Sequence, residues 1–540
     1  MTKPFAITLD VGSSLANRTG SWRTERPVYI DRLPPCNHAC PAGENIQAWL
    51  YHAEAGDYHQ AWASLVENNP LPAIMGRVCY HPCESSCNRG QLDKAVNIHS
   101  VERFLGDEAI RRGWKFEAPT PSGKRVLVVG SGPSGLSAAY HLARLGHKVS
   151  IYEAGPAAGG MMRFGIPKYR LPREILDAEI GRIADMGVTI QLNQRVDDLA
   201  RVLATGEFDA AFLAVGAHVA KRAYIPAGEA SHILDALSVL RNMEGAEPPQ
   251  LGRRVLVYGG GNTALDVART AKRLGATEAV IVYRRTRERM PAHDFEVQEA
   301  IDEGIQFRWL STIKRAGEGD FTIEKMKLDE KGFPQPTGEF ETIAGDSLVL
   351  ALGQDVDLSF LEKVQGLEIV DGVVKVNPQM MTGAAGVFAG GDMVPAERTV
   401  TVAVGHGKKA ARNIDAYLRG TTYQPAPQHE LASFNKLNTW YYSDAPETVQ
   451  PVLDAVRRQT TFDEVVQGLN EENALFEARR CLSCGNCFEC DNCYGVCPDN
   501  AVVKLGAGNR FRFNYDYCKG CGMCAAECPC GAIQMTPETI

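Results

Sequence analysis

Apolar and polar residues alternate differently along successive stretches of the chain, and these patterns predict its secondary structure. Between residues 41 and about 115, apolar residues recur every three or four positions, as on a helix with one buried face, and Pro70 and Pro72 stop the pattern. From Lys124 the pattern changes to KRVLVVG, a continuous apolar run with the length of a buried strand. We therefore predict a helical domain that precedes a domain built on a sheet.

The same order of elements occurs twice in the middle of the chain. KRVLVVG is followed by the amphipathic SGPSGLSAAYHLARLG and then by the strand-like KVSIYE, and the order recurs in RRVLVYGGGNTALDVARTAKRLG and TEAVIVYRR. Each stretch is typical of a βαβ unit with parallel strands. Further strand-like runs, TIEKMKLDE and DSLVLALGQ, lead to GVFAGGD, and another helix is predicted to begin near Val402. Residues 421–470 carry several prolines among polar residues, which indicates a linker with short helices.

Composition narrows the functional classes. The formal net charge of the 540-residue chain is −8, which argues against nucleic-acid binding because that needs a basic face. The sequence has no uninterrupted apolar run of about 18 residues, and its N-terminal stretch MTKPFAITLDVGSSLANRTG lacks the hydrophobic core of a signal peptide. We therefore expect a soluble cytoplasmic protein without a membrane span.

The first glycine-rich turn has the pattern of a dinucleotide-binding fingerprint. It reads Gly130-Ser131-Gly132-Pro133-Ser134-Gly135, between a predicted strand and a predicted helix whose N-terminus favours phosphate. Glu153 ends the next strand, where a carboxylate accepts hydrogen bonds from the hydroxyls of an unphosphorylated ribose. The alternative is a glycine-rich turn that arose by chance, and the acid in place argues against it.

The second turn predicts a different nucleotide. It reads Gly259-Gly260-Gly261-Asn262-Thr263-Ala264, with alanine as a permitted third residue. Its second strand ends in Arg284 and Arg285 rather than in a carboxylate, and guanidinium groups bind a 2'-phosphate through forked, charge-assisted hydrogen bonds. NADP(H) is therefore favoured over NAD(H). The alternative, that both arginines only lie at a solvated strand end, stays open.

The 16 cysteines fall into three groups, and none lies between residues 88 and 480. Clustered thiols without an export signal indicate metal ligands rather than disulfides. The two C-terminal groups repeat the spacing C-x2-C-x2-C-x3-C-P of bacterial two-cluster ferredoxins, in which the fourth cysteine of each run binds the other cluster. One [4Fe–4S] cluster is thus assigned to Cys487, Cys490, Cys493 and Cys528, and the other to Cys518, Cys521, Cys524 and Cys497.

Zinc is the alternative metal for these C-terminal runs, because paired C-x2-C motifs also bind it, but two full runs that end in proline favour iron. Three cysteines lie outside the two runs, namely Cys481, Cys484 and Cys530. We expect them to be packed or free thiols, with Cys484 as a competitor for a ligand position.

Over residues 34–420 the chain resembles the small subunit of NADPH-dependent glutamate synthase, whose core also occurs in dihydropyrimidine dehydrogenase and related ferredoxin:NADP oxidoreductases. The resemblance rests on PPCNHACPAGENIQ, GRVCYHPCESSC, GSGPSG, AGGMMRFGIPKYRLP, GGGNTA and GVFAGGD. It implies an FAD domain in two pieces with an NADPH domain between them. It also implies that Asp392, which follows Gly391, lies against the flavin, and that the helix with Thr401 and Val402 at its start points at the isoalloxazine. The residues that match the flavin-pocket stretch are Gly159, Gly160, Met161 and Gly165.

The N-terminal cysteines are interpreted with the help of the same resemblance. They are Cys36, Cys40, Cys79, Cys83 and Cys87, and five thiolates suffice for one four-iron cluster but not for two. The resembling family often has two clusters here, but the upstream C-x2-C that would complete the second is absent. The resemblance implies Cys40, Cys79 and Cys83 as ligands, with the fourth being either another cysteine of the group or Glu102. Cys36 and Cys87 are then remnants of the lost site, and zinc or buried thiols are the alternatives.

The expected fold is multidomain α/β, with two Rossmann-like domains of the glutathione-reductase type and a C-terminal bacterial-ferredoxin α+β domain. The expected parts are an α-helical iron–sulfur domain (1–120), two FAD pieces (121–250 and 341–420), an NADPH domain (251–340), a linker (421–470) and a two-cluster ferredoxin domain (471–540).

The expected function is an NADPH:acceptor oxidoreductase that moves electrons between NADPH, FAD and [4Fe–4S] clusters, to or from a ferredoxin or a larger redox subunit such as a 2-oxoacid:ferredoxin oxidoreductase. Hydride transfer to the flavin needs no acid–base residue, so no catalytic residue is assigned. A thioredoxin-reductase-like activity lacks its redox cysteines, since residues 88–480 contain none. The remaining alternatives are a glutamate synthase small subunit and a non-catalytic electron-transfer scaffold. We expect a hetero-oligomer in either oxidoreductase case.

Overall fold

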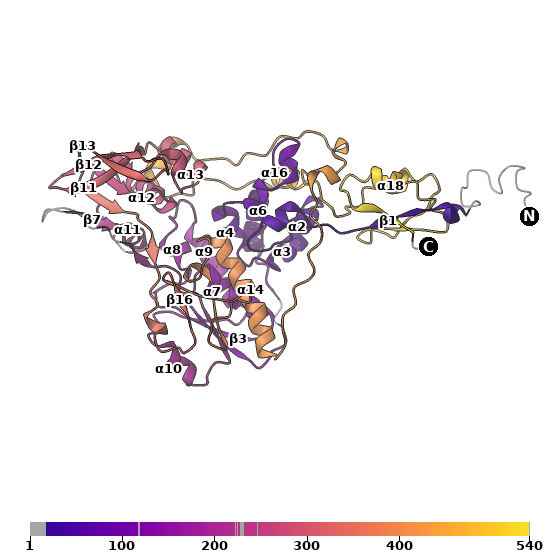
Figure 1. The fold of residues 1–540 in the computed structure, drawn as a ribbon, viewed down its shortest axis with the longest axis horizontal. Helices are drawn as coiled ribbons and strands as arrows, with labels where there is room; N and C mark the ends of the chain where they lie inside the picture. The colour runs from indigo at the N-terminus through magenta and orange to yellow at the C-terminus, as the bar shows by residue number, and fades with distance from the viewer. Residues whose placement is uncertain are drawn as a thin grey trace, which may run out of the picture.

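The computed structural model describes residues 18–116, 119–221, 223, 225–226, 232–245 and 247–538. Within these ranges the chain forms a helical unit, two units built on parallel sheets, and a small unit of short strands that projects at one end (Figure 1). No helix among the described residues combines the length and the apolar character that crossing a membrane requires.

The helical unit forms where the helical pattern predicts it. Its main helices are α2 (Ile46–Glu54), α3 (Tyr58–Val66), α4 (Pro72–Val78) and α6 (Ile98–Arg112). Pro72 begins α4, because proline is tolerated in the first turn of a helix. Helices α4 and α6 lie very close together, since a Cβ atom added to Gly76 would be 2.5 Å from the Cβ atom of Arg103. This approach brings the end of α4, at Cys79, close to α6.

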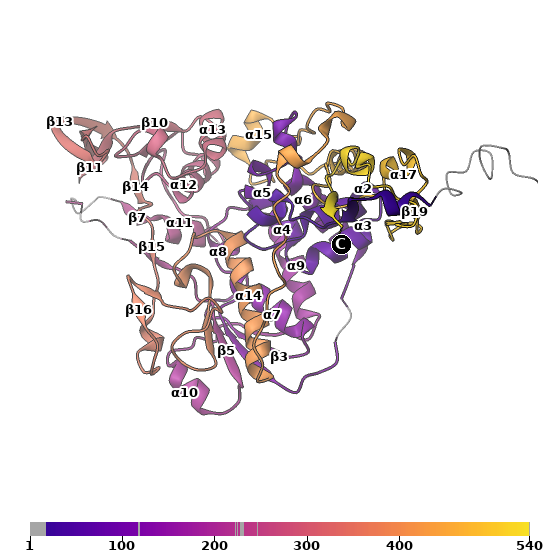
Figure 2. The same cartoon turned by 45° about the vertical axis from the view of Figure 1, so that its right-hand side comes forward.

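The first parallel sheet has the strand order β18-β5-β2-β3-β4. Its strands are β2 (Arg125–Val129), β3 (Lys148–Tyr152), β4 (Thr189–Gln191), β5 (Ala210–Leu213) and β18 (Val387–Ala389). Helix α7 (Pro133–Arg144) connects β2 to β3, as the first βαβ pattern predicts. Helix α14 (Val400–Leu418) follows β18 and lies along α7 (Figure 2). Two stretches of chain that are distant in sequence therefore complete one sheet and its helical cover.

The second parallel sheet has the order β10-β9-β8-β14-β7. Its strands are β7 (Ile233–Asp235), β8 (Arg254–Tyr258), β9 (Glu278–Val282), β10 (Gln306–Arg308) and β14 (Ser347–Leu350), with α12 (Asn262–Arg273) between β8 and β9. A separate antiparallel sheet consists of β11 (Ser311–Ala316), β12 (Asp320–Leu328) and β13 (Pro334–Ala344).

The borders expected at residues 250 and 340 fall inside this second unit. The stretch DSLVLALGQ, which we assigned to the second FAD piece, forms β14 and lies between β8 and β7. A short buried strand is equally apolar in either sheet, so periodicity alone does not decide which sheet it joins. β7 is only three residues long, too short to show a pattern of its own.

The segment after α14 is a linker with short helices, as predicted, but it is held along its length. It contains η7 (Phe434–Lys436), η8 (Thr439–Tyr441) and α15 (Ala455–Thr460). The backbone N–H of Val465 donates to the carbonyl of Tyr169 at 2.9 Å. The next helix, α16 (Glu471–Ala478), buries Ala474 and Ala478 in the core of the helical unit. The start of the expected ferredoxin domain thus packs with the N-terminal helices.

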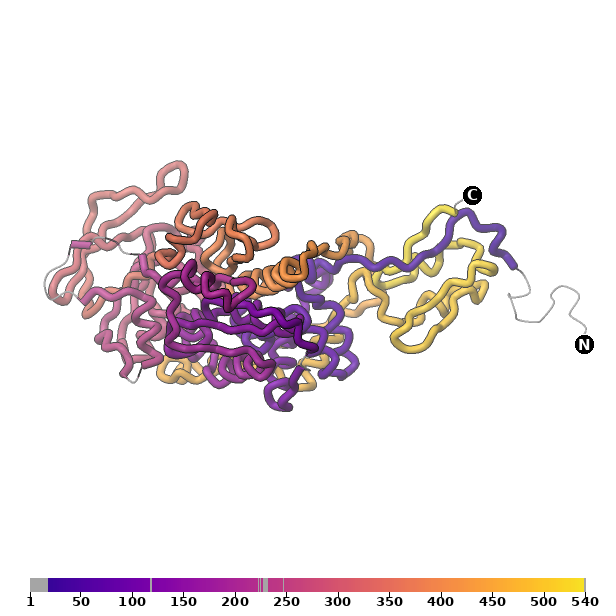
Figure 3. The backbone as a smooth tube through the Cα atoms, turned by 90° about the horizontal axis from the view of Figure 1, so that it is seen from below, coloured from indigo at the N-terminus to yellow at the C-terminus, as the bar shows by residue number. Residues whose placement is uncertain are grey.

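The C-terminal unit includes a strand from the N-terminal region. Its elements are α17 (Asn492–Gly495), β19 (Val502–Lys504), β20 (Phe511–Phe513), α18 (Met523–Ala526) and β21 (Ile533–Pro537). β1 (Glu25–Tyr29) pairs antiparallel with β21 from end to end (Figure 3). Residues 25–29, which we placed in the helical domain, therefore complete the C-terminal unit.

A buried ion network stabilises the second unit and predicts a stability effect. Glu303 follows α13 (Asp294–Asp302) and accepts hydrogen bonds from Arg269 at 2.8 and 3.0 Å and from Arg273 at 2.7 and 3.0 Å. We expect Glu303→Gln to lower the free energy of unfolding by about 3–5 kcal/mol, because the buried guanidinium of Arg273 loses its carboxylate partner and that of Arg269 keeps only Glu299. Thermal unfolding followed by circular dichroism measures the effect.

The control for this variant is Glu299→Gln, because Glu299 also pairs with Arg269 at 2.8 Å but its side chain is 29% exposed. Burial acts to raise the pKa of Glu303, but the hydrogen bonds from both arginines lower it below its ordinary value. The stabilisation is therefore complete above the unfolded pKa of about 4.3 and is lost as the pH falls through the folded value. Equal destabilisation by both variants would contradict this account.

Candidate cofactor and iron–sulfur sites

The first glycine-rich turn leaves room for a ligand at its second glycine. Gly130 has a φ of +101°, and a Cβ atom there would lie 2.4 Å from the carbonyl oxygen of Ala214. A Cβ atom on Gly135 would lie 2.0 Å from the carbonyl oxygen of Gly130, so the turn and α7 pack without a gap. At Gly132 the nearest such atom is the Cα of Gly160, at 4.0 Å. The three glycines thus meet the three requirements of a pyrophosphate-binding turn.

Glu153 is held firmly against this turn. Its carboxylate accepts hydrogen bonds from the backbone N–H of Ser131 at 2.9 Å, from the hydroxyl of Ser131 at 2.5 Å and from the backbone N–H of Gly155 at 2.7 Å. Ser131 was not predicted as a cofactor-site residue, because it occupies a variable position of the fingerprint. The carboxylate lies at the wall of a large cavity, where the ribose of a dinucleotide is expected to bind.

The cavity lies between the two parallel-sheet units. Its volume of about 900 Å³ is within the usual range of cofactor-binding cavities. The predicted cofactor residues that line it are Gly130, Gly132, Pro133, Ser134, Glu153, Gly160, Met161, Gly165, Asn262, Thr263, Gly391 and Asp392. The predicted residues outside its lining are Gly135, Gly159, Gly259, Gly261, Ala264, Arg284, Arg285, Thr401 and Val402. Both glycine-rich turns therefore contribute to one cavity, the second through the first residues of α12.

Asp392 and the start of α14 form a part of the cavity wall next to the first turn, since a Cβ atom on Gly391 would lie 3.1 Å from the Cβ atom of Ser134. Burial raises the pKa of the Asp392 carboxyl, and Arg398 partly offsets this effect. Helix α14 begins at Val400, two residues before the expected position, and its first turn is capped by the Thr399 hydroxyl, which accepts from the N–H of Val402 at 3.2 Å. A half-buried carboxylate and a helix N-terminus that line one cavity suit the hydroxyls and the electron-rich ring of FAD.

The second turn contacts the helical unit. A Cβ atom on Gly259 would lie 2.2 Å from the carbonyl oxygen of Ala351, while Gly261 has no such neighbour within 4 Å. The side-chain amide of Asn262, the first residue of α12, donates to the hydroxyl of Tyr80. Tyr80 also lines the cavity, and its ring stacks on His293 with 3.7 Å between centroids. The helical unit thus reaches the start of the helix that we expect to bind NADP(H).

Arg284 and Arg285 follow β9 at the edge of the second unit. Arg284 is exposed, whereas the Nε atom of Arg285 is buried and has no hydrogen-bond partner in the structure. The exposed guanidinium of Arg284 is accessible to a phosphate ligand, whose oxygens accept charge-assisted hydrogen bonds.

Four potential ligands gather next to the cavity. They are Cys40, after α1 (Pro35–Ala39), Cys79, after α4, Cys83 on α5 (Pro82–Ser85), and Glu102 on α6. Burial raises the pKa of Cys83 well above its ordinary value, and the neighbouring acids, Glu84, Cys79, Cys40 and Glu102, raise it further. Burial likewise raises the pKa of Glu102, which accepts a hydrogen bond from Asn69 at 2.7 Å. Acids that hinder one another's ionisation favour a cation among them.

The C-terminal cysteines gather as their spacing predicts. Burial raises the pKa of Cys493, and the nearby thiols of Cys487, Cys528 and Cys490 contribute. Cys497, Cys518, Cys521 and Cys524 line a second small cavity. In each set the fourth cysteine of one run joins the first three of the other, which is the arrangement of two [4Fe–4S] clusters.

The structure brings together a further set of four thiols that was not predicted from the sequence. Cys36 and Cys87, interpreted as remnants, line one small cavity with Cys481 and Cys484, which were expected to be packed or free thiols. A signal for this set was present in the sequence, because Cys481 and Cys484 have the C-x2-C spacing that is absent upstream of Cys36.

Three family models match the chain. Residues 124–407 match the pyridine nucleotide-disulphide oxidoreductase family. Residues 23–114 match dihydropyrimidine dehydrogenase domain II with a 4Fe-4S cluster, and residues 511–534 match a 4Fe-4S binding domain. The matched ranges coincide with the two parallel-sheet units, the helical unit and part of the C-terminal unit.

Curated relatives share most of the chain. The beta subunit of NADP(+)-dependent formate dehydrogenase from Moorella thermoacetica is 38% identical over 83% of this chain and 70% of its own length. The beta subunit of NADPH-Fe(3+) oxidoreductase from Geobacter sulfurreducens is 34% identical over 84% of this chain and 76% of its own. The small chain of glutamate synthase [NADPH] from Escherichia coli is 32% identical over 71% of this chain and 89% of its own.

The position of Glu153 predicts an effect on flavin binding. We expect Glu153→Gln to weaken FAD binding by about tenfold or more, because hydrogen bonds to a charged group contribute about 1.5–3 kcal/mol. Titration of FAD into flavin-free protein measures the dissociation constant. The control is Glu207→Gln, since Glu207 belongs to the same unit and is exposed. Unchanged FAD affinity in Glu153→Gln would remove Glu153 from the site.

Proposed function

Because this chain belongs to the pyridine nucleotide-disulphide oxidoreductase family, we propose that it carries electrons between NADP(H) and a separate redox partner. It is an NADPH-dependent oxidoreductase with FAD and [4Fe–4S] clusters as cofactors. Bound FAD supplies the conversion between the two-electron chemistry of nicotinamide and the one-electron chemistry of iron–sulfur clusters. The chain's own residues provide binding, orientation and a continuous series of ligand sites.

The observation that carries the proposal is the position of Cys79. Its two neighbours in sequence, Val78 and Tyr80, both line the large cavity. The hydroxyl of Thr401, in the first turn of α14, donates to the sulfur of Cys79 at 3.0 Å. One residue thus lies between the expected flavin site and the group formed by Cys40, Cys79, Cys83 and Glu102. This arrangement supports direct electron transfer between flavin and cluster.

We assign the residues at the cavity as follows. Gly132 and the N-terminus of α7 bind the pyrophosphate of FAD, and Glu153 binds its adenosine ribose. Asp392 accepts hydrogen bonds from flavin hydroxyls, and the N-terminus of α14 favours negative charge on the reduced ring. The N-terminus of α12 binds the NADP(H) pyrophosphate, with Arg284 and Arg285 at the 2'-phosphate.

The C-terminal unit is the proposed docking site for the redox partner. It lies at the end of the molecule opposite the NADP(H)-binding unit (Figure 1), and Cys490 and Cys521 are exposed there. Two of the relatives described above are named as beta subunits. We therefore propose a hetero-oligomer in which a ferredoxin or a larger catalytic subunit exchanges electrons with this unit.

The route through Cys79 predicts a kinetic separation. In anoxic protein mixed with NADPH, we expect the absorbance bands of both flavin and clusters to decrease. In Cys79→Ser the flavin band should still decrease, while cluster reduction slows by about tenfold or more, because the group beside the cavity loses a ligand. Stopped-flow absorbance measures both phases. If NADPH leaves the flavin band unchanged in the wild-type protein, the scaffold hypothesis is favoured instead.

The arginine pair predicts coenzyme preference. We expect the double variant Arg284→Ala, Arg285→Ala to raise the KM for NADPH by about 100-fold or more, since two charge-assisted phosphate contacts are lost at about 1.5–3 kcal/mol each. The KM for NADH should stay nearly constant. Arg308→Ala is the matched control, because Arg308 is exposed on β10, next to β9. Equal increases for both coenzymes would mean that the arginines only stabilise the fold.

A further inference from the structure

The four thiols of Cys36, Cys87, Cys481 and Cys484 converge from opposite ends of the sequence. Cys36 lies on α1, Cys87 precedes η3 (Asn88–Gln91), and the other two follow α16. All four line one small internal cavity whose other walls include Leu50, Val96 and Ile98. Cys36 and Cys484 are each only 9% exposed. An apolar chamber with four sulfur atoms in its wall has the composition of a soft-metal site.

Each pair among these four thiols is close enough to interact. Burial raises the pKa of Cys36 well above its ordinary value, and the neighbouring thiols of Cys87, Cys481 and Cys484 raise it further. Burial also raises the pKa of Cys481, to which Cys484 and Cys87 contribute. Cys87 has the same effect on Cys484, whose pKa burial raises to about 11. The set is therefore mutually adjacent rather than two separate pairs.

Hydrogen-bond donors point at two of the sulfur atoms. The side-chain amide of Asn88 donates to the sulfur of Cys484 at 3.4 Å, and the backbone N–H of Ser483 donates to the sulfur of Cys481 at 3.4 Å. The side-chain amide of Gln47 donates to the hydroxyl of Ser483 at 3.4 Å. Donors of this kind stabilise thiolate ligands and orient them toward a metal.

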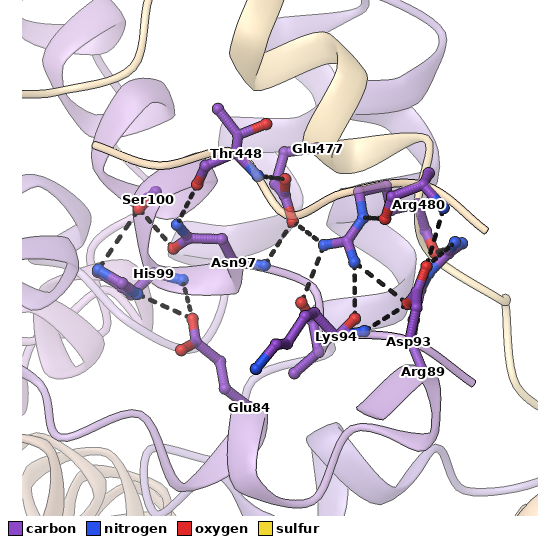
Figure 4. A network of polar contacts seen from close by, with 12 residues as sticks. Glu84, Arg89, Asp93, Lys94, Asn97, His99, Ser100, Thr448, Glu477 and Arg480 are labelled. Carbon is purple, nitrogen blue, oxygen red and sulfur yellow. Dashed lines mark hydrogen bonds and ion pairs between the residues drawn. The ribbon is translucent and has the colours of Figure 1, made fainter. Parts of the chain in front are cut away.

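A buried polar network fixes the chain immediately before Cys481 (Figure 4). Arg480 is 2% exposed and forms an ion pair with Glu477 at 2.5 Å. Arg480 also donates to the carbonyl oxygens of Ala95 at 2.9 Å and Lys94 at 2.7 Å. Glu477 accepts from the backbone N–H of Asn97 at 2.7 Å.

The network holds the end of α16 onto the segment between Cys87 and α6. From the other side, Arg89 donates to the carbonyl oxygen of Arg480 at 2.8 Å. These residues orient the C-terminal thiols but contribute no ligand themselves. Buried charges that bridge two chain segments specify one relative position, as a shared metal site requires.

We propose that Cys36, Cys87, Cys481 and Cys484 bind a further [4Fe–4S] cluster, with two ligands from each end of the chain. The four donors match the four-cysteine ligation of such clusters. This cluster is additional to the three sites assigned from the sequence, so the chain holds four clusters.

The neighbours of the four cysteines favour iron over zinc. Cys36 is four residues from Cys40, and Cys87 is four residues from Cys83, both in the group beside the flavin cavity. Cys484 is three residues from Cys487, in the C-terminal unit. The site thus lies between the flavin-side group and the C-terminal clusters. Zinc has no redox chemistry and would interrupt a series of one-electron carriers. The preference for iron, unlike the presence of a metal, rests on the proposed function.

Iron and acid-labile sulfide content test the proposal in the full chain, prepared without oxygen. Four [4Fe–4S] clusters give about sixteen irons per chain, and three give about twelve. We expect about sixteen in the wild-type protein and about twelve in the double variant Cys481→Ser, Cys484→Ser, with FAD content unchanged. Glu472→Gln is the control, since Glu472 is exposed in the first turn of α16 and the variant keeps both thiols, so it should retain about sixteen irons.

A second variant distinguishes loss of the cluster from misfolding of the C-terminal unit. Cys36→Ser leaves residues 471–540 untouched and should also lower the content to about twelve irons, because one ligand of the same cluster is lost. A wild-type content of about twelve irons without zinc would overturn the proposal, as would a Cys36→Ser variant with unchanged iron. One zinc lost in place of four irons would leave a metal site but refute the cluster. If iron behaves as expected and NADPH fails to reduce the flavin, only the proposed function is wrong.

Discussion

The contact between the loop at residues 78–80 and the cavity is the interaction on which the rest of the molecule depends. Val78 and Tyr80 form part of the cavity wall. The sulfur of Cys79 accepts a hydrogen bond from the hydroxyl of Thr401, and the hydroxyl of Tyr80 accepts one from the side-chain amide of Asn262. Three units of the chain therefore meet at three consecutive residues. Helices α4 and α6 approach so closely that only glycine fits at residue 76. The loop that follows α4 is therefore held near Glu102 on α6. Nucleotide binding and ligand geometry are set by the same backbone.

The sequence predicts those features whose parts are close together along the chain. Both glycine-rich turns and the C-terminal cysteine runs are local patterns with one structural solution, and the structure places them accordingly. Features formed by distant residues were predicted only where the family resemblance implied them, as for the FAD domain in two pieces. The pairing of β1 with β21 and the approach of Cys36 to Cys484 produce no repeating pattern in the sequence, because the two partners are far apart along the chain. The stretch that forms β14 joins the second sheet rather than the second FAD piece to which we assigned it, since β14 is apolar enough for either sheet.

The molecule separates its two kinds of chemistry in space and connects them through the helical unit. The parallel-sheet units hold the helix N-termini and glycine turns that suit phosphate, whereas the helical and C-terminal units hold the thiols. On one side, Tyr80 of the helical unit contacts the start of α12 in the second parallel-sheet unit. On the other side, the core of the helical unit around Trp49 and Trp62 includes Ala474 and Ala478 from α16, the helix that precedes the C-terminal unit. Relatives from three organisms are named for three different reactions.

The strand β1 and the segment around α16 impose an order on biosynthesis. A ribosome releases residues 25–29 and the first cysteines long before it has made β21 or Cys481. During this time β1 has no strand to pair with, and Cys36 and Cys87 lack the two C-terminal thiols. The nucleotide-binding units complete their sheets in the meantime, because all their strands precede α14. Insertion of the proposed cluster between the N-terminal and C-terminal cysteines is consequently a late event, and truncation before Leu469 deprives the N-terminal helices of part of their own core.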